Sequence, residues 1–180
     1  MRRLISLGYK CETAFQLRMH TGDASAQFFD WMMAPQVQSI VDVLDRDFDV
    51  FAPEHLGISV NRAGDRNVKD MVTGLSLPHA FPKIGRHVAA DFMIVYGDFL
   101  ARMRHLAARL RQSVAEGPVT FVRRRATVDE AEALERAVFR RFPAADARFL
   151  YVADHAFTTA HGHARSGLPE SAKTVPESGR

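Results

Sequence analysis

The chain has 180 residues, 47% of them hydrophobic and 25% charged, with a net charge of +3. This composition is that of an ordinary globular protein and excludes a disordered or fibrous class, and a chain of this length can bury a core without disulfides or a structural metal. The 20 arginines and 4 lysines are mostly scattered, so the basic excess does not indicate a nucleic-acid partner, and no apolar run reaches the roughly 20 residues of a membrane span.

The first predicted strand and the first predicted helix meet at the only cysteine. Leu4–Gly8 is a short apolar run that ends in glycine, which predicts a buried strand followed by a turn. Glu12–His20 has helical spacing and an acidic residue in its first turn. Cys11 lies between the two. One cysteine forms no intramolecular disulfide, and the N-terminus lacks the pattern of a secretory signal, so we expect a cytoplasmic protein.

The middle of the chain predicts one helix and several short strands. The apolar patch Phe28–Met33 contains one carboxylate, Asp30, which needs a partner if it is buried. Pro35 suits the first turn of a helix that runs to about Leu44. The β-like stretches are residues 48–51, 57–61, 67–72 and 74–77, of which the second and third form a predicted hairpin, and an irregular loop bracketed by Pro78 and Pro82 follows the last.

The last third of the chain carries the clearest pattern. Apolar residues at steps of three and four predict a helix over residues 91–112. Residues 118–153 predict a strand, a helix that opens on a capping box, and a parallel strand. We therefore predict an α/β fold with a mixed sheet and a parallel βαβ unit near the C-terminus. It forms a single domain over residues 1–155, followed by a polar tail, residues 156–180, predicted to be disordered.

Cys11 is the strongest candidate for chemistry. At the start of a helix, unpaired backbone N–H groups and the helix dipole favour a thiolate, and Lys10 would act in the same direction. Catalytic thiols in unrelated enzymes combine such a position with a histidine base and a polar group that orients the histidine. The alternative is that this cysteine packs as a small apolar residue.

Two histidines have the best context as a base. His79 lies in the proline-bracketed loop after a strand, and His155, with Asp154, directly follows the last predicted strand of the βαβ unit. Either could instead be a structural or surface histidine. Asp30 is a candidate orienting group for a histidine, and equally a candidate helix cap or ion-pair partner of an arginine.

A cluster of three arginines supports a rival hypothesis from another class of protein. Arg123, Arg124 and Arg125 follow an apolar strand and could meet a phosphate or carboxylate. Together with Asp154 and His155, they would then make the chain a non-catalytic α/β module that binds a phosphorylated or sugar-nucleotide ligand. The cluster could also be a solvated turn.

Metal and cofactor sites are not expected. The tail histidines could ligate a metal, but no carboxylate or thiol lies at matched spacing, so we predict no metal and no cofactor. The expected partner is a substrate that is a small molecule, a peptide or a glycan-linked compound. The sequence does not indicate nucleic-acid or membrane binding, and it leaves the oligomeric state open.

Five short motifs occur in an order that resembles a known family. They are Ser6–Cys11 (Ser-Leu-Gly-Tyr-Lys-Cys), Ala14–Arg18, Phe29–Trp31 (Phe-Asp-Trp), Pro78–Phe81 (Pro-His-Ala-Phe) and Phe121–Arg123 (Phe-Val-Arg). This order is similar to that in a family of bacterial proteins described as putative papain-like cysteine peptidases. The resemblance covers about residues 4 to 153.

The resemblance implies a cysteine-nucleophile hydrolase or acyltransferase. It implies Cys11 as nucleophile, His79 as base and Asp30 as orienting group. Lys10 and Ala80 depart from the family pattern, which has a smaller polar residue, often asparagine, and an acidic residue there. These departures add a third hypothesis, a non-catalytic member that mediates protein contacts. A papain-like core also implies an antiparallel sheet, in contrast to the parallel pair predicted near the C-terminus.

Overall fold

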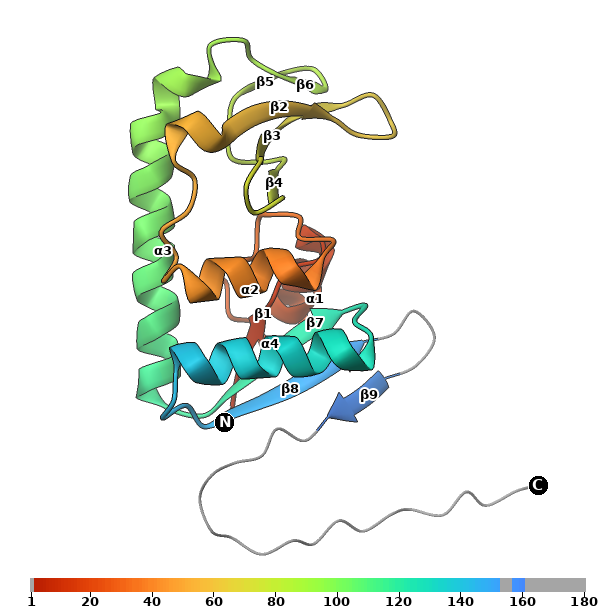
Figure 1. Cartoon of the computed structure of the whole chain (residues 1–180), viewed down its shortest axis with the longest axis vertical. Helices are drawn as coiled ribbons and strands as arrows, with labels where there is room; N and C mark the ends of the chain where they lie inside the picture. The colour runs from red at the N-terminus through yellow and green to blue at the C-terminus, as the bar shows by residue number, and fades with distance from the viewer. Residues whose placement is uncertain (1, 153–156, 161–180) are drawn as a thin grey trace, which may run out of the picture.

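A computed structural model describes residues 2–152 and the backbone of residues 157–160 (Figure 1). One sheet has the order β1-β7-β8-β9. Its first three strands, Arg3–Ser6, Val119–Arg124 and Ala147–Val152, are parallel, whereas the fourth, Phe157–Ala160, runs antiparallel to β8. The three strands nearest Cys11 are therefore parallel, as the βαβ pattern predicts, and they do not form the antiparallel sheet that a papain-like core implies.

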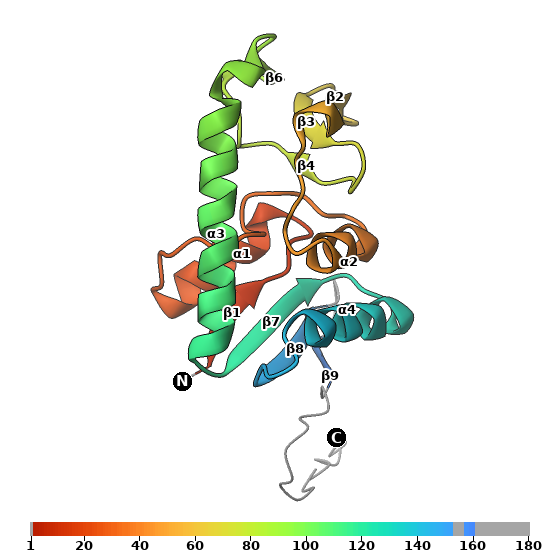
Figure 2. The ribbon, with the colours of Figure 1, turned by 60° about the vertical axis from the view of Figure 1, so that its left-hand side comes forward.

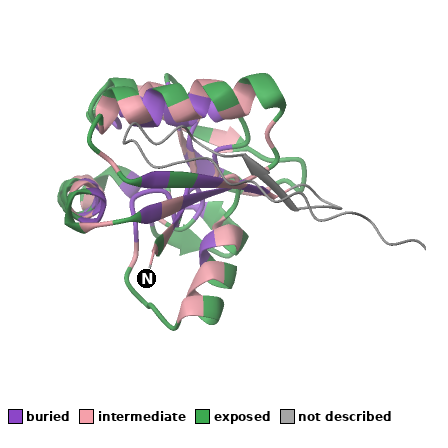
Figure 3. Cartoon of the chain, turned by 90° about the horizontal axis from the view of Figure 1, so that it is seen from below, coloured by how far each residue is buried: buried purple, intermediate pink, exposed green. Residues whose placement is uncertain are grey.

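The described residues form four α-helices, α1 (Cys11–Thr21), α2 (Val37–Asp45), α3 (Tyr96–Glu116) and α4 (Val128–Arg141). Seen along the sheet, α4 covers one face and α1 the other (Figure 3). α2 packs beside α4 (Figure 1). Phe121 and Phe149, stacked side by side in β7 and β8, are fully buried between these layers. Because both faces are covered, the strands carry apolar residues almost continuously.

A second sheet is built from the segment between α2 and α3. Its strands are β2 (Leu56–Val60), β3 (Arg66–Asp70), β4 (Ser76–Leu77), β5 (Lys83–Ile84) and β6 (His87–Val88), with the 3₁₀ turns Pro53–His55 and Phe92–Val95 on either side. The order is β2-β3-β6-β5, and β4 pairs with β3. The long helix α3 runs past both sheets (Figure 2).

Most of the predicted elements are confirmed. The βαβ unit is β7-α4-β8, the hairpin is β2–β3, and the helical pattern over residues 91–112 appears as a 3₁₀ turn followed by α3. The helix expected at Pro35 begins two residues later, at Val37. Within the predicted tail, the structure describes only the backbone of Phe157–Ala160; the other residues lie outside its described part.

The strand predicted at residues 48–51 is wrong. Phe48 and Phe51 have positive φ angles of 63° and 71°, which no strand contains. The backbone N–H of Phe51 donates to the buried carboxylate of Asp70 at 3.0 Å, so it is satisfied by a side chain and not by a neighbouring strand. The aromatic rings that suggest a strand instead fill the core between the two sheets.

No helix in the described part of the chain is both long and apolar enough to cross a membrane.

The capping box of α4 gives a first testable prediction. The Thr127 hydroxyl accepts the N–H of Glu130 at 3.3 Å, and the Glu130 carboxylate accepts the N–H of Thr127 at 2.8 Å. We expect Thr127→Ala to lower the free energy of unfolding by about 1 kcal/mol, because two helix-end donors depend on this pair. Urea unfolding measures it. The neighbouring Val128→Ala, at a side chain that is 76% exposed, is the control and should cost less than about 0.5 kcal/mol.

Candidate functional site

The chain turns sharply between the end of β1 and the start of α1, and this turn presents the thiol. Gly8 and Tyr9 both have positive φ, 74° and 81°. Cys11 is the first residue of α1, and its side chain is half-buried. Lys10, at the N-cap, makes no side-chain capping bond. The N–H groups of Cys11 and Glu12, which have no acceptor in a preceding helical turn, therefore lie beside the sulfur.

His79 is the histidine that the structure brings to this thiol. Its Nε2 lies 3.8 Å from the Cys11 Sγ, within the range of a sulfur hydrogen bond, although the two residues are 68 positions apart. His79 lies in the turn that follows β4. Pro78 in this turn is buried, whereas the side chain of His79 is exposed. The side chain of Arg102 on α3 donates to the carbonyl of Ala80 at 3.3 Å, which ties this turn to the long helix.

Asp30 is buried beside the site but does not contact His79. Its carboxylate accepts the Nη2 of Arg18 at 2.6 Å and the backbone N–H of Gln27 at 2.8 Å, and these are its hydrogen-bond partners among the described residues. Burial raises the pKa of Asp30 above its usual range, against the opposite effects of Gln27 and Arg18. The ion pair with an arginine, one of the alternatives for this residue, is thus present.

Trp31 joins this ion pair to the histidine. The Arg18 guanidinium lies over the Trp31 ring, 4.6 Å from its centroid, and the Trp31 and His79 rings meet edge to face with centroids 6.3 Å apart. Two backbone hydrogen bonds between Met33 and Ser76, of 2.8 and 3.0 Å, hold the segment that carries Trp31 against the strand that leads to His79. Asp30 therefore reaches His79 only through Arg18 and Trp31.

Arg123 lies beneath the thiol-bearing turn, where it is 0% exposed. Its Nη1 donates to the carbonyl of Leu7 at 3.0 Å and its Nη2 to the carbonyl of Pro35 at 3.3 Å. Burial lowers the pKa of Arg123 to about 10, which is still high enough to keep the guanidinium charged at neutral pH. Arg123, which the sequence offers as a ligand-binding residue, thus donates its hydrogen bonds to the backbone of the protein itself.

The two following arginines also contact the turn. Tyr9 has the guanidinium groups of Arg123 and Arg125 within 5.6 and 5.2 Å of its ring centroid, and its hydroxyl accepts from Arg125 at 2.6 Å. Arg124 forms an ion pair of 2.7 Å with Glu12 in the first turn of α1. The arginine cluster therefore supports the loop and helix that carry Cys11. Asp154 and His155, which the ligand-binding hypothesis adds, lie outside the described residues.

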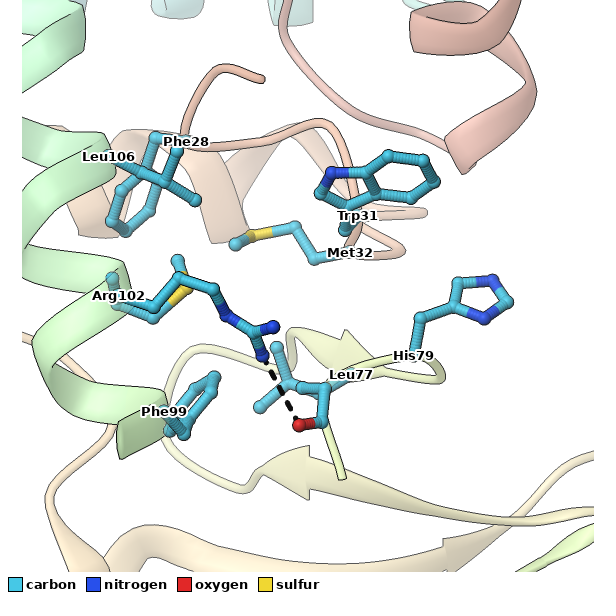
Figure 4. A pocket seen from close by; sticks show the side chains of 10 residues that line it. Phe28, Trp31, Met32, Leu77, His79, Phe99, Arg102 and Leu106 are labelled. Atoms are coloured by element: carbon cyan, nitrogen blue, oxygen red, sulfur yellow. Dashed lines mark hydrogen bonds between the residues drawn. The ribbon is translucent and has the colours of Figure 1, made fainter. Parts of the chain in front are cut away.

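Sequence reasoning did not identify Trp31, Arg18 and Arg102 as parts of the site. The first two lie inside motifs of the family resemblance, which is the one signal that could have found them. Arg102 also lines a cavity of about 270 Å³ that opens beside His79 and Trp31 (Figure 4). Nothing in the spacing of the sequence predicts that cavity, because its walls come from three separate segments.

A metal centre is not among the features of the site. No group of three or more His, Cys, Asp or Glu side chains in the described residues could hold a metal ion. The tail histidines considered as ligands lie outside those residues.

Replacing Arg123 tests its role beneath the turn. We expect Arg123→Met to lower the free energy of unfolding by roughly 2–4 kcal/mol, because the carbonyls of Leu7 and Pro35 lose a buried charged donor. Arg148→Met, which removes an exposed arginine from β8, should cost less than about 0.5 kcal/mol. Equal losses in the two variants, measured by urea unfolding, would contradict a structural role for Arg123.

Comparison with known proteins identifies the family of the chain. A family model described as putative papain-like cysteine peptidase matches residues 2–148, which include Cys11, Asp30, His79 and Arg123. Neither the curated proteins nor the solved structures contain a match to this sequence. With the family model covering most of its length, the chain belongs to the putative papain-like cysteine peptidase family.

Proposed function

We propose that the protein is a cysteine-dependent hydrolase or acyltransferase in which Cys11 is the nucleophile and His79 the base. The observation that carries this proposal is the 3.8 Å contact between the Cys11 Sγ and the His79 Nε2, at the start of a helix. Nucleophile and base within reach of each other are the minimal unit of thiol catalysis. Family membership supports the same chemistry.

The proposed reaction begins when the His79 imidazole takes the Cys11 proton. The thiolate sulfur attacks the substrate carbonyl carbon, an S–C bond forms, and the electron pair of the C=O bond moves to the oxygen. In this proposal the N–H groups of Cys11 and Glu12 donate to this oxyanion. The intermediate collapses, the bond to the leaving group breaks, and the imidazolium returns its proton to the leaving group.

The second half of the reaction releases the acyl group. Water, or another acceptor in a transferase, gives a proton to the His79 imidazole and attacks the thioester carbonyl. The S–C bond then breaks and the imidazolium reprotonates the sulfur. No oxidant, metal or cofactor is required, because each proton removed is returned within the cycle.

Asp30 takes part in this proposal as a positioning residue. Its ion pair with Arg18 fixes the guanidinium over Trp31, and Trp31 packs against the edge of the His79 side chain. The carboxylate is thus proposed to orient the histidine through two intervening side chains, and not by a direct hydrogen bond. An exposed imidazole needs such support because its own rotamers are otherwise free.

The base role of His79 can be tested by alkylation of the only thiol. We expect His79→Ala to slow the reaction of Cys11 with iodoacetamide at pH 7 roughly 10-fold or more, because the proton acceptor is lost. At about pH 10 free thiols ionise without a base, so the two proteins should there react at similar rates. Intact mass spectrometry follows the alkylation.

The matched control is His20→Ala, which removes an exposed histidine from the last turn of the same helix. It should leave the rate at pH 7 unchanged. If the His79→Ala variant reacted at pH 7 as fast as the wild-type protein, the assignment of this histidine as base would be overturned.

The positioning role of Asp30 predicts a weaker effect in the same assay. Asp30→Asn should slow alkylation at pH 7 a few-fold while leaving the rate at about pH 10 unchanged, because only the orientation of the base is disturbed. Adding Trp31→Leu should then change the rate little further, since both residues act on His79 through the same contact. Fully additive losses in the double variant would contradict the proposed route from Asp30 to His79.

A further inference from the structure

The cavity beside the Cys11–His79 pair is lined mainly by apolar side chains. They come from the Asp30 segment, β4 and α3 and are Phe28, Met32, Leu77, Phe99, Met103 and Leu106. Trp31, His79 and Ala80 complete the wall nearest the thiol. Figure 4 shows Trp31 and His79 at one side of the hollow and Phe99, Arg102 and Leu106 at the other. One end of the cavity therefore adjoins the proposed base.

The charge of the cavity is that of a single guanidinium. Arg102 is the only arginine or lysine among the residues that line it, and none of these residues is acidic. Its Nη2 donates to the Ala80 carbonyl at 3.3 Å, so the side chain reaches from α3 to the turn that carries His79 (Figure 4). A cationic substituent placed here would meet this positive charge with no carboxylate to pair with it.

The volume limits the size of an occupant. A dry cavity of about 150 Å³ takes one benzene ring, so 270 Å³ has room for roughly ten carbon atoms by the same scale. That is one large aromatic side chain with its linker or a medium-length acyl chain. Apolar walls favour such a group, because its transfer from water is the main source of affinity in a pocket with few polar partners.

We propose that this cavity is the specificity pocket of the enzyme and takes a bulky, uncharged, apolar group attached close to the scissile carbonyl. The inference rests on the proposed function, since Cys11 must attack that carbonyl. The substrate class is an ester, thioester or amide whose acyl portion carries an aromatic or medium-length aliphatic substituent. Arg102 excludes cationic substituents and holds the His79 turn against the pocket.

The test uses three alkylating reagents that share the same iodoacetamide group and differ in the substituent on its nitrogen. They are iodoacetamide, N-(2-phenylethyl)iodoacetamide and N-(2-aminoethyl)iodoacetamide. In each reaction the Cys11 sulfur forms a bond to the reagent carbon, the C–I bond breaks, iodide leaves, and the thiol proton passes to His79. We expect the phenylethyl reagent to alkylate Cys11 at least roughly 10-fold faster than iodoacetamide at low concentration, and the aminoethyl reagent to show no such gain.

Three variants on α3 show whether the preference arises in the cavity. Leu106→Trp fills the cavity and should bring the ratio of phenylethyl to parent rate close to one, whereas Ala108→Trp, at an exposed position outside the cavity, should leave the ratio unchanged. Met103→Ala enlarges the cavity and should shift the preference toward a naphthylethyl reagent. The enlarged variant keeps the proposal testable if Leu106→Trp does not fold.

The outcomes separate the pocket from the chemistry. A wild-type ratio near one, an equal gain for the aminoethyl reagent, or a ratio unaffected by both Leu106→Trp and Met103→Ala would overturn the pocket assignment. Failure of the proposed function appears elsewhere, as a parent iodoacetamide rate that does not depend on His79. The ratio between reagents remains measurable in that case, because it compares binding at the same thiol.

Discussion

The buried guanidinium of Arg123 is the interaction on which the site depends. Its two donors bind the carbonyls of Leu7 and Pro35, which belong to the turn before Cys11 and the loop before α2. The first of these carbonyls directly precedes two residues with left-handed backbone angles. Such a turn is costly for Tyr9, which is not glycine, and it persists because surrounding contacts fix it. This buried cation thus supports the turn from which α1 leaves the sheet, and with it the position of the thiol.

A second group of contacts surrounds the imidazole of His79. Asp30 contacts Arg18, twelve residues earlier, and Arg18 contacts Trp31, the residue that follows Asp30, so these side chains connect a buried carboxylate to an exposed ring. The raised pKa of Asp30 reflects its burial, whereas its hydrogen bonds act to keep it ionised. Among the described residues, aromatic and cation–π packing therefore connects Asp30 to His79, whereas a catalytic triad has a direct hydrogen bond between the orienting group and the imidazole.

The sequence predicts those elements of this protein in which apolar residues recur at regular spacing. The parallel βαβ unit, the hairpin and the helix over residues 91–112 all follow from regular spacing, and so does the position of Cys11 between strand and helix. Residues 48–51 were misassigned because their apolar pattern resembles a strand, while the hydrogen bond from Phe51 to the distant Asp70 decides the backbone. For Arg123 the sequence indicates either a contact with a phosphate or carboxylate or a solvated turn, and only the fold reveals the carbonyls to which it donates. The cavity was beyond prediction, since no local pattern records how separate segments enclose a space.

The thiol and the imidazole lie beyond strands of two different sheets. Cys11 follows β1 of the parallel sheet, whereas His79 follows β4 of the smaller mixed sheet, and α3 runs past both (Figure 2). The distance between the Cys11 Sγ and the His79 Nε2 therefore depends on how the two sheets are positioned relative to each other. A displacement of about one bond length between them would break the contact while leaving each sheet intact. The contact between the Cys11 thiol and the His79 imidazole would then be lost before the protein unfolds, so loss of this contact and loss of structure need not share a midpoint on heating or in denaturant.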